Sequence, residues 1–161
     1  MRVPARDLGI LFVGSRKGYR DLWCAHLEAA GLPLHRRFTD QSRANSLGTE
    51  DYLQLLKRAR LVFNCSLVSS RAQQTNFRIY EAMSARAPLL ELDFPGMRDY
   101  FVPYVHYAPF ANTHEMISTA RFLLKHRDVA ERMAEQAFAW YQGHFAGPHF
   151  WRRLVAELDA V

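Results

Sequence analysis

Two charged side chains three residues apart, Arg78 and Glu81, are well suited to bind a ligand together. Residues at this spacing share one face of a helix, and Ile79, Ala82 and Met83 point the other way. A guanidinium binds phosphate oxygens, and a carboxylate accepts hydrogen bonds from the hydroxyls of a ribose. Near the start of a helix, Arg78 or the helix dipole would hold phosphate while Glu81 held the ribose. The spacing by itself favours a plainer interpretation, a surface ion pair worth about 0–1 kcal/mol.

The pair is placed by a stretch that predicts a strand, a polar loop and a helix. Leu61–Phe63 is apolar and β-prone, and Ser66–Gln74 is almost free of large apolar side chains. Thr75 or Asn76 can act as the helix N-cap, and Pro88 ends the helix before a second apolar run. A buried strand that leads through a polar loop into a helix presents backbone N–H groups and the positive helix end to an anion. Ser66, Thr75 and Asn76 are therefore candidate contacts of a phosphate-bearing ligand.

A second candidate loop follows the first predicted strand, which ends at Gly14. Residues 14–18, GSRKG, occupy the position of a phosphate loop, although G-x-x-x-G is neither the dinucleotide fingerprint nor a P-loop. Gly14 would let a ligand approach the backbone beside Ser15, and Arg16 and Lys17 would pair with a diphosphate. The alternatives are a turn that needs glycine and basic side chains that are merely solvated.

Strands and helices alternate along the chain, which favours a doubly wound parallel sheet of about five strands in three α/β/α layers. The predicted strands are Leu8–Gly14, Leu34–Phe38, Leu61–Phe63, one from Leu89, and Tyr104–Tyr107; the predicted helices are Arg20–Ala30, one from Thr49, the one around Glu81, one from Asn112 or Thr113, Asp128–Tyr141, and the closing Pro148–Asp159. The default order of the strands in such a Rossmann-like sheet is 3-2-1-4-5, counted along the chain. Ligands bind beyond the carboxyl ends of the strands, where the loops 14–18, 66–75 and 93–99 would border one crevice.

Length and composition fit one domain over residues 1–161. With 49% apolar and 23% charged residues the chain is globular, and no apolar run approaches the roughly 20 residues of a membrane span. No signal peptide is expected. Cys24 and Cys65 lie in apolar patterns typical of buried thiols in a reducing compartment, so a cytoplasmic protein is predicted. No cysteine and histidine spacing resembles a metal site, and no metal or other cofactor is expected.

The segment from Gln73 to Glu91, QQTNFRIYEAMSARAPLLE, resembles the donor-binding helix of glycosyltransferases with two Rossmann-like domains, the GT-B fold. It is most similar to the spore-maturation-protein type of glycosyltransferase, whose C-terminal domain has an R-x-[FY]-E-A-M-A-x-G-x pattern. The similarity covers most of the chain from Leu8 onward and continues through Tyr100-Phe101, Tyr107, Glu115-Met116, Asp128–Tyr141 and Phe150–Leu154.

By that resemblance Glu81 matches the glutamate that usually holds the donor's ribose, and Gly14 matches the glycine of the loop near the diphosphate. Two positions depart from the family pattern and bear on the sugar contact. Gln73 stands where retaining members often carry a glutamate, and Arg86 replaces the glycine after the helix. In the family the general base usually comes from an N-terminal domain, which this chain is expected to lack, so no catalytic residue is assigned here.

These observations give a leading hypothesis and two competitors. The leading one is the donor-binding half of a glycosyltransferase, which binds a nucleotide-diphospho-sugar and transfers a hexosyl group to an unknown acceptor once an acceptor-binding domain or chain closes the cleft. The first competitor is a non-catalytic α/β module, derived from such a domain, that binds a partner protein; the missing half, Gln73 and Arg86 motivate it. Nucleic-acid binding, motivated by a net charge of +5 and 18 arginines, ranks last because the arginines are spread along the chain.

Two further expectations concern individual side chains. Glu81 should lean back toward the strand ends, because helical side chains tilt toward the helix N-terminus. Glu81→Gln should therefore weaken nucleotide binding far more than Glu91→Gln, a control at a strand end. The apolar stripe of the closing helix should be partly exposed; it consists of Phe150, Trp151, Leu154 and Leu158.

Overall fold

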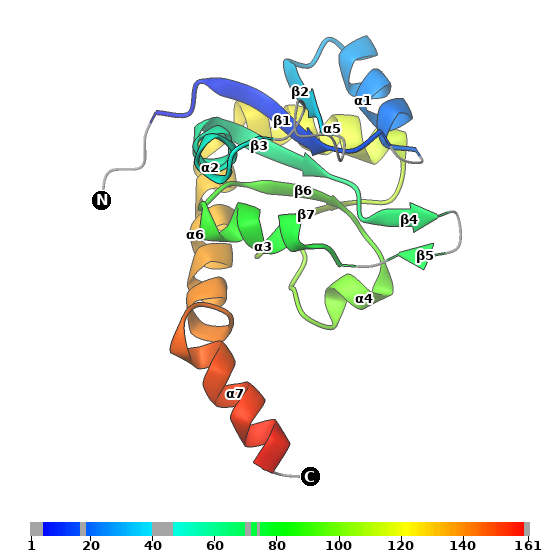
Figure 1. The fold of residues 1–161 in the computed structure, drawn as a ribbon. Coiled ribbons are helices and arrows are strands. Elements are labelled where there is room, and N and C mark those ends of the chain that lie inside the picture. The colour runs from blue at the N-terminus through cyan, green and yellow to red at the C-terminus, as the bar shows by residue number, and fades with distance from the viewer. Residues whose placement is uncertain (1–4, 17–18, 40–46, 70–71, 74, 160–161) are drawn as a thin grey trace.

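The computed structural model describes residues 5–16, 19–39, 47–69, 72–73 and 75–159, and its centre is a parallel sheet of five strands (Figure 1). The strands lie in the order β2-β1-β3-β6-β7. Their bounds are Leu8–Gly14 for β1, Leu34–Phe38 for β2, Ala59–Asn64 for β3, Leu89–Leu92 for β6 and Ala108–Phe110 for β7. Most residues of β1, β3 and β6 are buried because helices cover both faces of the sheet.

The strand order corrects the prediction. Counted along the chain, the five strands lie in the order 2-1-3-4-5, so the default order 3-2-1-4-5 is wrong for this protein. The reason lies in β2, where His35, Arg36 and Arg37 are exposed. Such a strand suits the edge of a sheet, whereas the default order would require it to pair on both sides. β3 pairs instead with the other side of β1, where Leu61 lies opposite Ile10.

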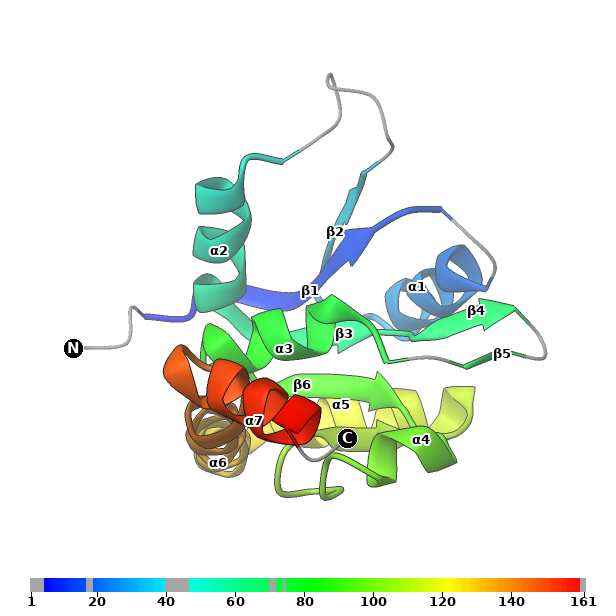
Figure 2. The ribbon, with the colours of Figure 1, turned by 60° about the horizontal axis from the view of Figure 1, so that its bottom comes forward.

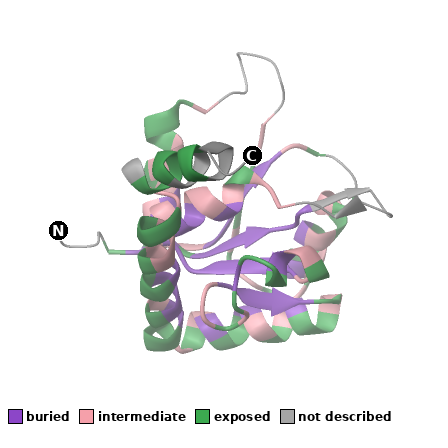
Figure 3. Cartoon of the chain, turned by 90° about the horizontal axis from the view of Figure 1, so that it is seen from below, coloured by how far each residue is buried: buried purple, intermediate pink, exposed green. Residues whose placement is uncertain are grey.

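Two apolar cores lie on the two faces of the sheet. Alternate residues of β1 show this, because Ile10 and Phe12 belong to one core and Leu11 and Val13 to the other. Helices α1 and α5 pack on the first core and α2 and α3 on the second, while α6 contributes to both (Figure 2). Figure 3 shows the buried strands between helices whose outer faces are exposed. The helices are α1 Arg20–Ala29, α2 Thr49–Arg58, α3 Phe77–Ser84, α4 Pro95–Arg98, α5 Thr113–Lys125, α6 Arg127–His144 and α7 Pro148–Asp159.

Three local predictions also change. The loop after β3 contains two short antiparallel strands, β4 (Leu67–Ser69) and β5 (Ala72–Gln73), and the loop after β6 contains the single turn α4. The strand predicted over Tyr104–Tyr107 lies later in the chain, as β7, and includes Pro109. A proline cannot donate a hydrogen bond to a neighbouring strand, and β7 tolerates it because β7 is an edge strand that pairs only with β6.

A buried arginine joins the segment before β1 to three helical regions. Arg6 is 4% exposed and donates hydrogen bonds to both carboxylate oxygens of Glu131 on α6, at 2.6 and 3.1 Å. It also donates to the backbone carbonyls of Lys57, Ala59 and Arg86. The buried charge is therefore fully paired. Arg6 connects one end each of α2, α3 and α6 beside the amino end of β3.

The closing helix extends away from the sheet and contacts α6 (Figure 1). Phe150 and Trp151 on α7 are 39% and 62% exposed, which confirms that the predicted apolar stripe is partly exposed. Val155, outside that stripe, is 54% exposed. The side chains of Leu154 and Leu158 lie outside the described residues. Within the described ranges, no helix is both long enough and apolar enough to cross a membrane.

The two cysteines lie in the interior on the α1 side of the sheet. Cys24 and Cys65 are both buried, and no disulfide joins these two described residues. Burial raises the pKa of the Cys24 thiol to about 12, so this side chain packs as a small neutral group.

Candidate functional site

The start of α3 lies where β3 ends, and two asparagines connect the elements. Asn76 is the N-cap of α3, because its Oδ1 accepts a hydrogen bond from the backbone N–H of Arg78 at 3.1 Å. Asn64, the last residue of β3, donates from Nδ2 to Asn76 Oδ1 at 3.1 Å. The Oδ1 of Asn64 accepts from Arg78 Nη1 at 3.3 Å. The end of the strand therefore holds the guanidinium at the positive end of the helix.

A buried carboxylate lies beneath this connection. Glu91 on β6 is fully buried, and its Oε2 accepts a hydrogen bond from Asn64 Nδ2 at 2.5 Å. Its Oε1 accepts from the backbone N–H groups of Ser66 and Leu92 at 2.9 and 3.1 Å. Burial raises the pKa of Glu91 to about 7, although these hydrogen bonds favour the charged form. Glu91 is therefore connected to the start of α3 through Asn64 and does not suit the role of an independent control at a strand end.

A pocket of about 360 Å³ opens beside this network, between α2, α3 and the end of β1. Its described lining consists of Val13, Thr39, Leu47, Thr49, Tyr52, Arg78 and Glu81. The hydroxyl of Tyr52 donates a hydrogen bond to Glu81 Oε2 at 2.8 Å. Burial, and then the Glu81 carboxylate, raise the pKa of this hydroxyl, so it is a donor at neutral pH. Glu81 bonds to Tyr52 and Arg78 to Asn64, an arrangement that differs from a simple surface ion pair between the two charges.

A second arginine approaches the same place from α1. Arg20 donates from Nη1 to Ser15 Oγ at 2.9 Å, and its Nε is buried without a hydrogen-bond partner among the described residues. Burial and the positive charge of Arg78 both lower the pKa of Arg20. Gly14 lies against Arg78, since a Cβ at this position would meet Arg78 Nη1 at 3.3 Å. Two guanidiniums that repel each other, one with an N–H to spare, favour an anion as the ligand.

The structure brings together part of the predicted set. Gly14, Asn76, Arg78 and Glu81 lie around the end of β1 and the start of α3. Ser66 is 1% exposed and donates its N–H to the carboxylate below, so it supports the wall of the site from beneath. The binding roles of these residues remain predictions.

Other predicted residues lie elsewhere or outside the described ranges. The guanidinium of Arg16 stacks on the ring of Phe38, 4.6 Å from its centroid, which places it beside β2. Ser15 accepts the hydrogen bond from Arg20, and Thr75 is half-buried just before the N-cap. The structure does not describe Lys17, Gly18, Gln74 or the side chain of Gln73.

The departure from the family pattern at Arg86 has a local explanation. Arg86 follows the C-terminal end of α3 and has a φ of 53°, in the left-handed region where glycine is favoured after a helix. Its guanidinium lies 4.1 Å from the ring centroid of Phe138 and 3.4 Å from Glu135, both on α6. Arg86 therefore packs against α6, at the opposite end of α3 from Arg78.

Four residues of this region did not stand out in the sequence: Arg20, Tyr52, Asn64 and Glu91. Two of them left a signal, because an asparagine at the end of one apolar strand and a glutamate within another are unusual for buried strands. Tyr52 fits an apolar helix face, and only its contact with Glu81 distinguishes it. Within the described residues, no group of three or more His, Cys, Asp or Glu side chains could hold a metal ion.

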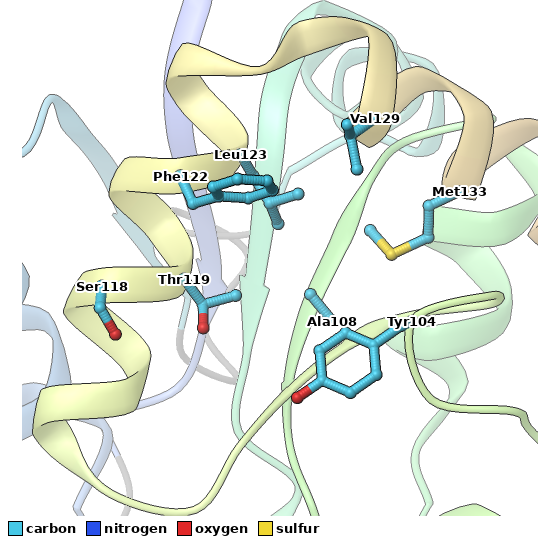
Figure 4. A pocket seen from close by; sticks show the side chains of 8 residues that line it. All are labelled: Tyr104, Ala108, Ser118, Thr119, Phe122, Leu123, Val129 and Met133. Carbon is cyan, nitrogen blue, oxygen red and sulfur yellow. The ribbon is translucent and has the colours of Figure 1, made fainter.

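A second pocket, of about 430 Å³, lies between α5, the start of α6 and the loop before β7 (Figure 4). Its lining is Tyr104, Ala108, Ser118, Thr119, Phe122, Leu123, Val129 and Met133. None of these residues is charged, and the Ser118 hydroxyl bonds to carbonyl oxygens of its own helix. Apolar contact therefore dominates this pocket, and none of its described lining residues carries a charge that would attract an anion.

With its doubly wound sheet and a charged pocket at the strand ends, the protein is of the Rossmann-like α/β class. It belongs to the glycosyl transferase-like family, whose profile matches residues 4–160. The resemblance of the sequence to glycosyltransferases of the GT-B fold is thereby confirmed.

Solved structures share the fold at low sequence identity. The crystal structure of TarM has a TM-score of 0.72 and 12% identity, and the match covers 94% of this chain and 35% of TarM. Alr3699/HepE from Anabaena, solved in complex with UDP, has a TM-score of 0.67 and 16% identity, with coverage of 94% and 40%. AviGT4, a glycosyltransferase involved in avilamycin A biosynthesis, has a TM-score of 0.58 and 17% identity, with coverage of 96% and 53%. This chain therefore spans about a third to a half of these proteins. No curated protein sequence matches it.

Proposed function

We propose that this chain is the donor-binding half of a glycosyltransferase and that it binds a nucleotide-diphospho-sugar in the pocket between α2 and α3. The main support is that Arg78, at the start of α3, and Glu81, one turn later, line one pocket at the carboxyl end of β1. Ligands of doubly wound sheets bind at this end. The family match and the UDP bound to the HepE structure support this class of ligand. We place the protein in the cytoplasm, because Cys24 and Cys65 are buried in apolar surroundings, as is typical of thiols in a reducing compartment.

The ribose, the diphosphate and the base of the donor each have a complementary part of the pocket. The Glu81 carboxylate accepts hydrogen bonds from the ribose hydroxyls through the oxygen that Tyr52 leaves free. The diphosphate lies at the N-terminus of α3, between Arg78 and Arg20. Val13 and Leu47 supply the apolar side of the pocket, which suits the face of a base.

The same groups favour sugar transfer. When an acceptor oxygen bonds to the anomeric carbon, the bond from that carbon to the diphosphate breaks, and its electron pair stays on the leaving phosphate. The negative charge that develops there is stabilised by Arg78, Arg20 and the N–H groups at the start of α3. The proton of the acceptor hydroxyl passes to a general base, and we assign this base and the acceptor site to a second domain or chain.

A non-catalytic module that binds a partner protein is the second candidate. The observation that favours it is the exposed apolar stripe on α7, where Trp151 is 62% exposed. An interaction surface of this kind serves either candidate, because a second domain and a separate partner can both cover it. Tight association with another protein, combined with no affinity for nucleotides, would select the module.

The test is calorimetry with UDP and GDP on the wild-type chain and on Glu81→Gln. The variant should bind about ten- to a hundredfold more weakly, because losing a charge-assisted hydrogen bond costs ~1.5–3 kcal/mol. Glu135→Gln is the matched control, since Glu135 is an exposed glutamate on α6, away from the pocket. Glu91 is unsuitable as a control because it belongs to the buried network. Absence of binding to the wild-type chain at about 1 mM nucleotide, or equal affinities for the two variants, would contradict the proposal.

A further inference from the structure

The hydrogen bond between Tyr52 and Glu81 connects the two helices that border the polar pocket. Tyr52 lies in the second turn of α2, and Glu81 lies 29 positions later on α3. Both side chains are half-buried, and the tyrosine packs against the apolar core formed by α2, α3 and the sheet. The tyrosine ring is held by this packing, so its hydroxyl is a fixed donor.

The consequence of this bond is a fixed carboxylate. A glutamate has several rotatable bonds and, without a partner, samples many orientations in solvent. With Oε2 bonded to Tyr52 at 2.8 Å, the carboxylate of Glu81 is oriented before any ligand arrives. A ligand that bonds to Glu81 then does not have to order it, which is the advantage of a preorganised site.

A fixed acceptor also penalises a ligand that lacks the matching donor. If one hydroxyl of the ligand is absent, a mobile carboxylate reorients and accepts a hydrogen bond from water instead. A fixed and half-buried carboxylate loses a hydrogen bond that it cannot replace. We propose that Tyr52 is a positioning residue that makes this pocket select ribose over 2′-deoxyribose by holding the carboxylate of Glu81. This inference rests on the proposed binding of a nucleotide at Glu81.

The experiment compares one ribonucleotide with its 2′-deoxy counterpart. UDP and 2′-deoxy-UDP, or GDP and 2′-deoxy-GDP if only guanine nucleotides bind, are titrated by calorimetry into the wild-type chain and Tyr52→Phe. The wild type should prefer the ribonucleotide about tenfold, and in Tyr52→Phe the preference should fall to within about threefold. The loss should come from weaker ribonucleotide binding, with the deoxynucleotide affinity nearly unchanged.

The matched control is Tyr80→Phe, which also removes one hydroxyl from a half-buried tyrosine. The ring of Tyr80 stacks on Phe145 and packs on Phe101, on the α6 side of α3, so the ribose preference should stay at the wild-type value. Melting curves confirm that each variant is folded. Adding Tyr52→Phe to Glu81→Gln should change the preference no further, because Tyr52 acts through Glu81.

The outcomes separate this inference from the proposed function. If the wild type binds the nucleotides and Tyr52→Phe keeps the wild-type preference for ribose, the role of Tyr52 is wrong and the proposed function stands. An equal loss of preference in Tyr80→Phe would also overturn the role of Tyr52, because it would indicate general loosening of the helices. If the wild-type chain binds no nucleotide, both the proposed function and this inference fail.

Discussion

The two pockets of this protein have similar volumes, about 360 and 430 Å³, and opposite chemistry. The polar pocket lies at the carboxyl end of β1, where a helix begins and two arginines meet. The apolar pocket includes Ala108, the first residue of β7, and the later part of α5, so it lies toward the amino ends of the strands.

The difference follows from what each end of a parallel sheet offers. At the carboxyl ends, helix N-termini present N–H groups and positive dipole ends, and polar side chains there gain a partner in a ligand. At the amino ends, the sides of helices meet the edge of the sheet, and the gap is lined by side chains that also serve the core. Volume alone therefore does not identify the binding site. In each test, a substitution at or beside the polar pocket is paired with a control substitution at the apolar pocket.

The largest expected difference is in the pH dependence of stability. The pKa of Glu91 is raised from 4.5 to about 7 in the folded state, so between these values the folded protein holds a proton that the unfolded chain has released. The contribution of Glu91 to the free energy of unfolding is therefore fully present below about pH 4.5 and is lost as the pH rises to about 7, roughly 3 kcal/mol in all. Urea unfolding at about pH 5 and pH 8 should show the wild type losing roughly 2–3 kcal/mol relative to Glu91→Gln.

The control for this comparison is Met133→Leu in the apolar pocket. Met133 is buried beside uncharged side chains, so its substitution should change the free energy of unfolding equally at both pH values. A difference between the wild type and Glu91→Gln that does not vary with pH would show that Glu91 titrates normally.

The next effect is on ligand affinity. Arg78→Ala removes a guanidinium that lines the polar pocket and leaves Asn64 Oδ1 without its donor, so UDP or GDP should bind roughly thirtyfold more weakly, a loss of ~2 kcal/mol. Phe122→Ala removes a larger side chain from the apolar pocket and should leave the affinity unchanged. Calorimetric titration of both variants with the nucleotide measures these affinities. Equal weakening by Phe122→Ala would mean that the two pockets do not differ in the way proposed.

The smallest expected effect is on the free energy of unfolding when a hydroxyl on a pocket wall is replaced by a methyl group. Thr119→Val replaces a hydroxyl with a methyl group on the wall of the apolar pocket (Figure 4) and should raise the free energy of unfolding by about 0.5 kcal/mol. Thr49→Val makes the same replacement on the wall of the polar pocket, where Thr49 is exposed, and should bring no gain. Denaturant unfolding at one pH measures both changes. If Thr49→Val stabilised the protein as much as Thr119→Val, the description of one pocket as polar and the other as apolar would be contradicted.

The sequence was sufficient for those parts of the site that depend on neighbours in the chain. Helix α3, a cap at Thr75 or Asn76 and the placement of Glu81 beside a strand end follow from short-range patterns, because capping and helical periodicity act within a few residues. The structure selects Asn76 as the cap. The overall α/β class follows from the alternation of strands and helices.

The parts that could not be predicted depend on distant pairs. The hydrogen bond from Asn64 to Glu91 joins positions 27 apart. The raised pKa of Glu91 results from burial, which depends on how the whole sheet is covered. The bond from Tyr52 to Glu81 likewise depends on how α2 sits beside α3. The strand order depends on which side of β1 accepts β3, a choice made by the packing of the whole sheet.

The backbone conformation of Arg86 has a consequence for how this family can vary. A side chain in the left-handed region costs roughly 1–2 kcal/mol relative to glycine, and here the contacts of Arg86 with Phe138 and Glu135 act against that cost. Glycine at position 86 releases both positions on α6 from this role, whereas arginine retains them. Substitutions at 86, 135 and 138 should therefore be mutually dependent. Among homologous chains, the residue at position 86 should covary with the residues at positions 135 and 138. Replacing glycine at position 86 should be tolerated only after α6 offers such contacts, because a side chain at this φ angle is strained.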